Sequence, residues 1–132
     1  MSKYWLDYVK HCYDLVVETE GQAGLVLDHE IEAYIVHLMA RNFERTDIGK
    51  CAVAIQFLQA MSTKRTERLL KLTEVADECL LIHSYPLRRT KWPTDTYYQD
   101  MGITAYGLAA HAMEHNFIRA GKVLTAIFNT KN

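Results

Sequence analysis

The chain has 132 residues, of which 49% are hydrophobic and 23% charged, and its formal net charge is −1. This length gives one domain that buries roughly two thirds of its unfolded surface, and two prolines and six glycines leave no long linker. The near-neutral balance does not favour a nucleic-acid-binding domain, and no apolar run approaches the roughly 18 residues of a membrane-spanning helix.

The three cysteines, Cys12, Cys51 and Cys79, are widely spaced and form no C-x-x-C pair. An odd number of isolated cysteines favours neither a disulfide framework nor a cysteine zinc clip. Charged side chains recur between residues 3 and 20, so this stretch lacks the apolar core of a signal peptide. We therefore expect a cytoplasmic protein that does not associate with a membrane.

Charge is distributed unevenly along the chain. Residues 1–50 contain five Lys or Arg and nine Asp or Glu, a net of −4, whereas residues 51–91 contain seven and four, a net of +3. The basic residues form two groups: Lys64, Arg65, Arg68 and Lys71, and then Arg88, Arg89 and Lys91. Such groups can contact an anionic ligand or nucleic acid, but a solvated helix face and a loop explain them as well. We prefer the solvated surface.

Apolar residues recur at steps of three and four along most of the chain, which is the pattern of amphipathic helices. The spacing predicts a first helix over residues 2–20, ended by Gly21. A second helix begins at Asp28 and ends near residues 42–45.

The same spacing predicts two further helices in the middle of the chain. One runs over residues 46–61, starting at Thr46 or Asp47, and the next covers residues 64–84. In the first of these the predicted buried line is Cys51, Ala54, Ile55 and Leu58.

Two prolines, Pro86 and Pro93, bracket a loop, because proline lacks an amide donor and disfavours helix in the residue before it. A fifth helix begins at Thr94 or Asp95 and carries apolar residues from Tyr98 to Ala112, and a break near Asn116 separates it from a last helix with Phe117. No segment has the period of a strand. The sequence therefore predicts an all-α, single-domain bundle of five or six helices over residues 1–132.

The stretch HAMEH places His111 and His115 four residues apart, with Glu114 beside the second. Residues four apart share a helix face, so both imidazoles could bind one metal ion. The order H-x-x-E-H matches the inverted zinc-peptidase helix. Only 17 residues follow His115, however, which leaves little room for the distant third ligand of such an enzyme.

A metal site inside a helical bundle is the closer comparison. Ferritin-like sites need Glu-x-x-His, which this chain lacks. The histidines are more similar to those of the DinB-like bundle family, in which an early histidine joins a late His-x-x-x-His pair. His37, His29 or Glu30 would then be the third ligand that zinc requires. We expect structural histidines and no cofactor, with a divalent metal at His111, His115 and His37 as the alternative.

Two stretches together resemble a poorly characterised family of small bacterial helical proteins. They are DHEIEAYIVHLMAR (28–41), with an E-x-E-x-Y pattern, and DTYYQDMGITAYGLAA (95–110), with Y-Y-x-x-M-G-x-x-A-Y-G. Between them, ADECLLIHSYP (76–86) occupies the place of the family's hydrophobic helix and loop. The resemblance implies a bacterial cytoplasmic protein and points to the motif residues Glu30, Glu32, Tyr34, Tyr97, Tyr98, Met101, Gly102, Tyr106 and Gly107. It implies no catalytic role.

The motif residues admit a pocket as well as a packing role. Glu30, Tyr34 and Tyr97 could line such a pocket together with Arg88 or Arg89, whereas Tyr98 and Tyr106 fit a face packed on another helix. No nucleophile elbow, Walker loop or dinucleotide-binding glycine motif is present. We therefore predict a non-enzymatic interaction or adaptor domain that binds a protein partner or itself, with metal binding and anion or nucleic-acid binding as alternatives.

Overall fold

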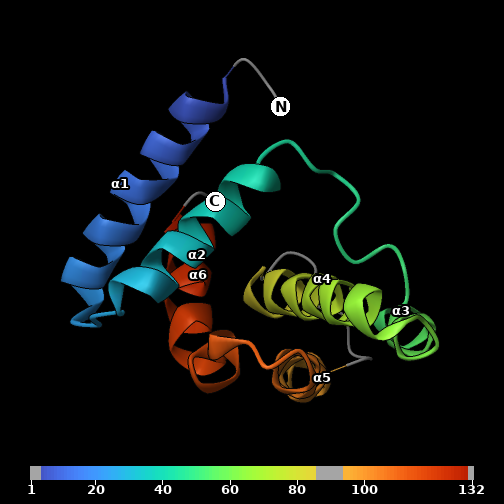
Figure 1. The fold of residues 1–132 in the computed structure, drawn as a ribbon. Coiled ribbons are helices and arrows are strands. Elements are labelled where there is room, and N and C mark those ends of the chain that lie inside the picture. Colours follow the sequence, from blue (N-terminus) through green and yellow to red (C-terminus); the bar gives the residue numbers. More distant parts are fainter. Residues whose placement is uncertain (1–3, 86–93, 131–132) are drawn as a thin grey trace.

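The computed structural model describes residues 4–85 and 94–130 (Figure 1). In chain order its helices are α1 (Trp5–Ala23), α2 (His29–Arg41), α3 (Val53–Met61), α4 (Arg65–Ser84), α5 (Asp95–Leu108), the short 3-10 helix η2 (Ala112–His115) and α6 (Phe117–Thr130). The described part of the chain contains no strand, so the predicted all-α bundle is confirmed. None of the described helices combines the length and the apolar character needed to cross a membrane.

Helix α6 lies between two groups of helices (Figure 1). It packs against α1 and α2 on one side and against α4 and α5 on the other. Its buried side chains recur at steps of three and four and are Phe117, Ala120, Val123, Leu124 and Ile127. Full burial of a large apolar side chain contributes roughly 1.5–3 kcal/mol, so this stripe holds the two groups together.

Helix α1 ends about one turn later than predicted. Gly21 keeps helical backbone, and Gly24 takes the left-handed conformation, with φ 66° and its N–H donated to the Glu20 carbonyl. A left-handed glycine is the usual end of a helix, since it satisfies a carbonyl of the last turn without a side-chain clash. Two glycines were available, and the second one ends the helix.

Helix α3 begins at Val53, so the prediction that it starts at Thr46 or Asp47 was wrong. Glu78 of α4 holds the preceding segment in an irregular path, because its carboxylate accepts hydrogen bonds from Arg45 at 2.8 and 3.0 Å and from the backbone N–H of Gly49 at 3.0 Å. Gly49 has φ 82°, which an α-helix cannot contain. These long-range bonds leave no local pattern in the sequence.

The predicted buried line of α3 was also wrong. Ile55 and Leu58 are 58% and 68% exposed, and Cys51 is exposed before the helix begins. The buried residues are Val53 and Ala60. Most side chains of this short helix are apolar, so its pattern marks no polar face, and contact with α4 decides which face is buried.

Helix α5 ends at Leu108, well before the predicted break near Asn116. Ala110 has a positive φ of 54°, the N–H of Ala110 bonds to the Gly107 carbonyl at 3.0 Å, and that of His111 bonds to the Tyr106 carbonyl at 2.9 Å. This left-handed turn reverses the chain, and η2 leads from it into α6.

Candidate functional site

His111 and His115 do not share an α-helix, because α5 has already ended. His111 precedes η2, its Nδ1 accepts the N–H of Met113 at 3.1 Å, and its ring lies against Tyr34 with 4.6 Å between ring centres. The side chain of His115 is 81% exposed and lies beside Glu114. The shared helix face on which the metal prediction depended is therefore absent.

The proposed third ligands lie elsewhere. His37 is exposed, with Nδ1 2.8 Å from the Ala33 carbonyl, and its ring packs on Trp5. His29 is exposed beside Glu32, and Glu30 is also exposed. Within residues 4–85 and 94–130, no group of three or more His, Cys, Asp or Glu side chains could hold a metal ion.

Two of the predicted residues, Tyr34 and Tyr106, converge on Asp77. Tyr34 comes from α2 and Tyr106 from α5, and both hydroxyl groups donate to the same oxygen of Asp77 in α4, Oδ1. The bond from Tyr106 measures 2.6 Å and is fully buried. The two stretches that carry the family resemblance therefore meet at a third helix, through an acid that was not among the predicted site residues.

The electrostatics of this cluster are set by burial. Burial raises the pKa of the Asp77 carboxyl above its ordinary value, and the hydrogen bonds from Tyr106 and Tyr34, followed by the positive charge of Arg41, act in the opposite direction. Burial also raises the pKa of both tyrosines. Both hydroxyls therefore remain protonated and keep donating at neutral pH.

A signal for Asp77 was present in the sequence. Asp77 and Glu78 are adjacent acids with Val75 and Ala76 before them and Cys79 and Leu80 after them, in the middle of a predicted amphipathic helix. Charged residues are almost never buried without partners, so two acids inside an apolar run indicate either a break in the helix or two buried partners. In the structure each acid has partners: tyrosines for Asp77, and Arg45 with Gly49 for Glu78.

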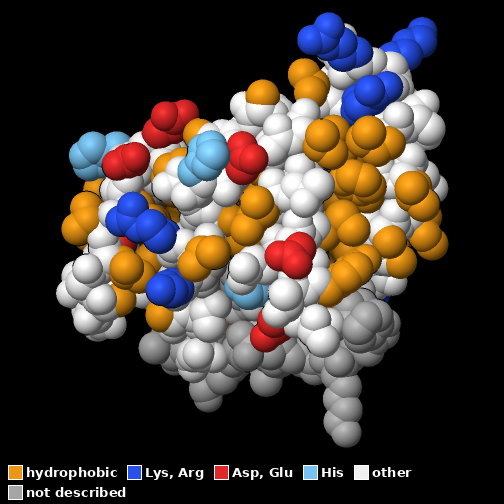
Figure 2. Space-filling view, turned by 90° about the horizontal axis from the view of Figure 1, so that it is seen from below, with side chains coloured by type: hydrophobic (Ala, Val, Ile, Leu, Met, Phe, Trp, Pro, Cys, Tyr) orange, Lys and Arg blue, Asp and Glu red, His pale blue; other side chains and the backbone are white. Residues whose placement is uncertain are grey.

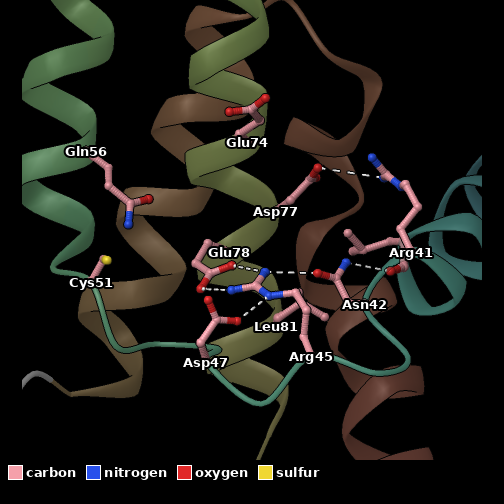
Figure 3. A pocket seen from close by; sticks show the side chains of 11 residues that line it. Arg41, Asn42, Arg45, Asp47, Cys51, Gln56, Glu74, Asp77, Glu78 and Leu81 are labelled. Carbon is pink, nitrogen blue, oxygen red and sulfur yellow. Dashed lines mark hydrogen bonds and ion pairs between the residues drawn. The ribbon is translucent and has the colours of Figure 1, made fainter. Parts of the chain in front are cut away.

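A cavity of about 410 Å³ opens beside the two acids (Figure 3). Its walls come from the end of α2, the irregular segment 42–52, the first turn of α3 and the middle of α4. Arg45 crosses one side of it, bonded to Glu78 and, through Nε at 2.8 Å, to Asp47. On the other side Arg41 Nη2 lies 3.9 Å from Asp77 Oδ2. The cavity is therefore lined mainly by charged groups.

The remaining predicted pocket residues do not join this cluster. Glu30 is exposed at the start of α2, and Tyr97 packs on Tyr98 with 5.2 Å between ring centres. Glu32 faces Glu20, and its pKa is raised, first by a hydrogen bond with that carboxyl and then by burial. Arg88 and Arg89 lie outside the described residues. The predicted grouping of Glu30 and Tyr97 with Tyr34 is thus replaced by Asp77 and Tyr106.

One face of α3 presents three large apolar side chains to solvent. Ile55, Leu58 and Met61, at steps of three, form what we name the α3 face; they are 58%, 68% and 38% exposed. Lys64 and Arg65 follow directly and are exposed. Figure 2 shows hydrophobic side chains gathered beneath Lys and Arg side chains on the side of the molecule where Figure 1 places α3.

The other members of this basic group already have partners. Arg68 donates to the Thr63 carbonyl at 3.1 Å, and Lys71 lies 4.0 Å from Glu67. Lys64 and Arg65 are thus the members of this group for which the described part of the chain shows no side-chain bond, and the anion or nucleic-acid alternative stays a prediction.

The outer side of α1 carries a second exposed apolar surface, and most of the charged residues beside it are acidic, unlike the basic residues beside the α3 face. Leu6, Tyr13 and Val17 share one side of the helix by their spacing and are 78%, 49% and 42% exposed; we name them the α1 stripe. Exposed charged residues lie beside it: the acids Asp7, Asp14 and Glu18 and the base Lys10, so the surface is acidic on balance. The molecule thus has an acidic apolar surface and a basic apolar surface on separate helices.

Comparison of the chain with protein-family models, with curated proteins and with solved structures found no match.

Proposed function

We propose that this chain is a protein-interaction domain that associates with itself, and that the α1 stripe of one copy packs on the α3 face of another. The observation that carries the proposal is the exposure of Ile55 and Leu58, at 58% and 68%, on a helix that buries so little of its apolar surface. Contiguous apolar surface on a small domain is typical of an interaction site, because its burial is favourable by about 25 cal/mol per Å².

Charge favours the α1 stripe as the occupant over a second α3 face. Two α3 faces in contact would place Lys64 and Arg65 of both copies in one interface with no acid of α3 to offset them, and an excess of like charge opposes association. The α1 stripe instead brings Asp14 and Glu18 to these cations. Two different surfaces meet in this contact, so the assembly is either a closed ring or an open chain of copies.

Removal of the apolar contact tests the proposal first. Sedimentation velocity over a wide range of concentration should show a mass that grows with concentration for the natural chain, and a monomer for Leu58→Asp, because a charge then lies at the centre of the contact. Leu108→Asp is the matched control, since Leu108 is 48% exposed on α5 and belongs to neither the α1 stripe nor the α3 face, and it should leave the mass unchanged. A natural chain that stays monomeric throughout contradicts the proposal.

A charge exchange tests the pairing itself. Asp14→Lys with Glu18→Lys, and Lys64→Glu with Arg65→Glu, should each yield monomers because like charges then face each other. An equal mixture of the two double variants should associate again, since the basic α1 of one meets the acidic α3 region of the other. Monomers in the mixture would show that another pair of surfaces makes the contact.

A further inference from the structure

The cavity beside Asp77 has charged walls of two kinds (Figure 3). On one side Arg45 is bonded to Glu78 and Asp47, so these three groups satisfy one another. On the other side Arg41 Nη2 lies 3.9 Å from Asp77 Oδ2, and Asp77 and Glu74 both line the cavity. Two carboxyl groups against one guanidinium leave this side with an excess of acceptors.

Two hydrogen bonds to one oxygen fix the orientation of Asp77, whereas its other oxygen has only a distant ion pair among the described residues. Tyr34 and Tyr106 both bond to Oδ1, which holds the carboxyl group in place. Oδ2 accepts no hydrogen bond from any described residue, and the guanidinium of Arg41 lies 3.9 Å away, beyond hydrogen-bond distance. A buried carboxylate is costly unless its oxygens are bonded, so this oxygen is ready for a donor from outside the chain.

Arg41 is a weak counter-ion for Asp77. Its side chain is 51% exposed, and its Nε is already bonded to the His37 carbonyl at 3.3 Å. A solvent-exposed arginine at this distance gains little from the ion pair and can move into water at small cost. A cation with N–H donors can therefore take its place.

The second acid enlarges the acceptor site. Glu74 precedes Asp77 by one turn of α4, so both side chains are on one side of the helix, and Figure 3 shows them along the same wall of the cavity. Gln56 lies across from them on α3, where its amide can bond to a polar part of a ligand. The volume of about 410 Å³ corresponds to about 14 waters of about 30 Å³ each, which suits a small organic molecule.

We propose that this cavity binds a small organic cation, with an ammonium or guanidinium group that donates to Asp77 Oδ2 in place of Arg41 and with Glu74 as the second negative charge. The site is separate from the surfaces of the self-association proposal, so either proposal can fail without the other. A buried acid that lines a cavity and whose pKa is raised by burial is typical of functional sites, which supports a ligand role for Asp77.

Two simple probes test the proposal on isotope-labelled protein by amide NMR: n-butylguanidinium chloride and n-butylammonium chloride. Both should cause saturable shifts of the Gln56 side-chain amide and of the backbone amides of residues 74–78. Sodium butyrate at equal ionic strength should not. Shifts that never saturate, or equal shifts with butyrate, would overturn the proposal.

Three variants locate the site. Asp77→Asn keeps the shape and removes the charge, so the dissociation constant should rise by about tenfold or more. Arg41→Ala should lower it, because the competing cation is gone. Asp100→Asn, an exposed acid on α5, is the matched control and should not change it.

Glu74→Gln decides the question if Asp77→Asn fails to fold. Glu74 is exposed, so its replacement should not affect folding, and it should weaken binding while Arg41→Ala strengthens it. Effects of the same sign in these two variants, or none in either, would show that the probes bind elsewhere.

Discussion

Asp77 and the adjacent acid Glu78 lie in a part of α4 where the residues on either side of the pair are apolar and buried. Two tyrosines from different helices compensate for lost hydration of Asp77, yet the pKa of this acid remains raised because burial outweighs them. The ionised form is therefore less favourable in the folded chain than in the unfolded chain.

The raised pKa of Asp77 predicts how stability depends on pH. A carboxyl with a raised folded pKa favours the folded state below its unfolded pKa of about 3.9, and that contribution is lost as pH rises through the folded pKa. The Asp77→Asn side chain does not ionise, so this variant does not lose stability as pH rises, and its amide oxygen can still accept the hydrogen bonds from both tyrosines. The variant should be more stable than the natural chain in denaturant unfolding at pH 7, with a difference that shrinks towards pH 4.

Asp100→Asn is again the control, since Asp100 is exposed, and its unfolding should follow the natural chain at both pH values. A lower stability of Asp77→Asn at neutral pH would mean that the hydrogen bonds from the two tyrosines to the ionised carboxylate outweigh the cost of burying its charge.

The three cysteines should differ in reactivity because the fold exposes one of them and buries the other two. Cys51 is exposed, whereas Cys12 and Cys79 are buried, and burial raises the pKa of Cys79 to about 12. Thiolate is the reactive form of cysteine. A maleimide reagent should therefore label Cys51 of the native chain much faster than the other two, as mass spectrometry of the digested protein can measure; rapid labelling of Cys79 would indicate that α4 opens.

Helices α4, α5 and α6 approach each other closely at Gly102. A β-carbon at this position of α5 would lie 2.9 Å from Phe117 Cζ and 3.1 Å from Cys79 Cβ. Packing therefore requires a residue without a side chain at position 102, because only glycine lets α5 approach both the first residue of α6 and the middle of α4.

This close approach predicts opposite effects for two Gly→Ala substitutions. Gly102→Ala should lower the free energy of unfolding by roughly 1–3 kcal/mol, because the methyl group overlaps a buried aromatic ring. Gly21→Ala in α1 meets nothing within 4 Å and should raise it by about 0.4–1 kcal/mol, since alanine restricts the unfolded chain and favours helix. Urea unfolding measures both; a stabilised Gly102→Ala would contradict the packing.

At the scale of the whole molecule, opposite charge is placed on separate apolar surfaces. The acidic excess of the first fifty residues belongs to α1 and α2 and their connections, and the basic excess that follows begins at the junction of α3 and α4. Figure 1 places α1 and α3 on opposite sides of the fold, so one copy cannot join its own two surfaces.

Salt therefore should weaken the proposed association. Raising ionic strength from about 0.1 M to about 1 M shortens the screening length from about 10 Å to about 3 Å, which reduces the attraction of Asp14 and Glu18 for Lys64 and Arg65. Sedimentation should show a smaller average mass at high salt at a fixed protein concentration. An unchanged or larger mass would assign the contact to apolar surface alone.

The sequence by itself determined the helical class and the approximate extent of most helices, because these depend on neighbours three and four residues away. Tertiary structure decided where α3 begins and which of its faces is buried, because Glu78 fixes the chain before it through Arg45 and Gly49. It also decided that Tyr34 and Tyr106 meet at Asp77 rather than at Glu30 or Tyr97. Such pairings join residues that are tens of positions apart, and their energies come from burial and from bonds between helices, which leave no periodic mark on the chain.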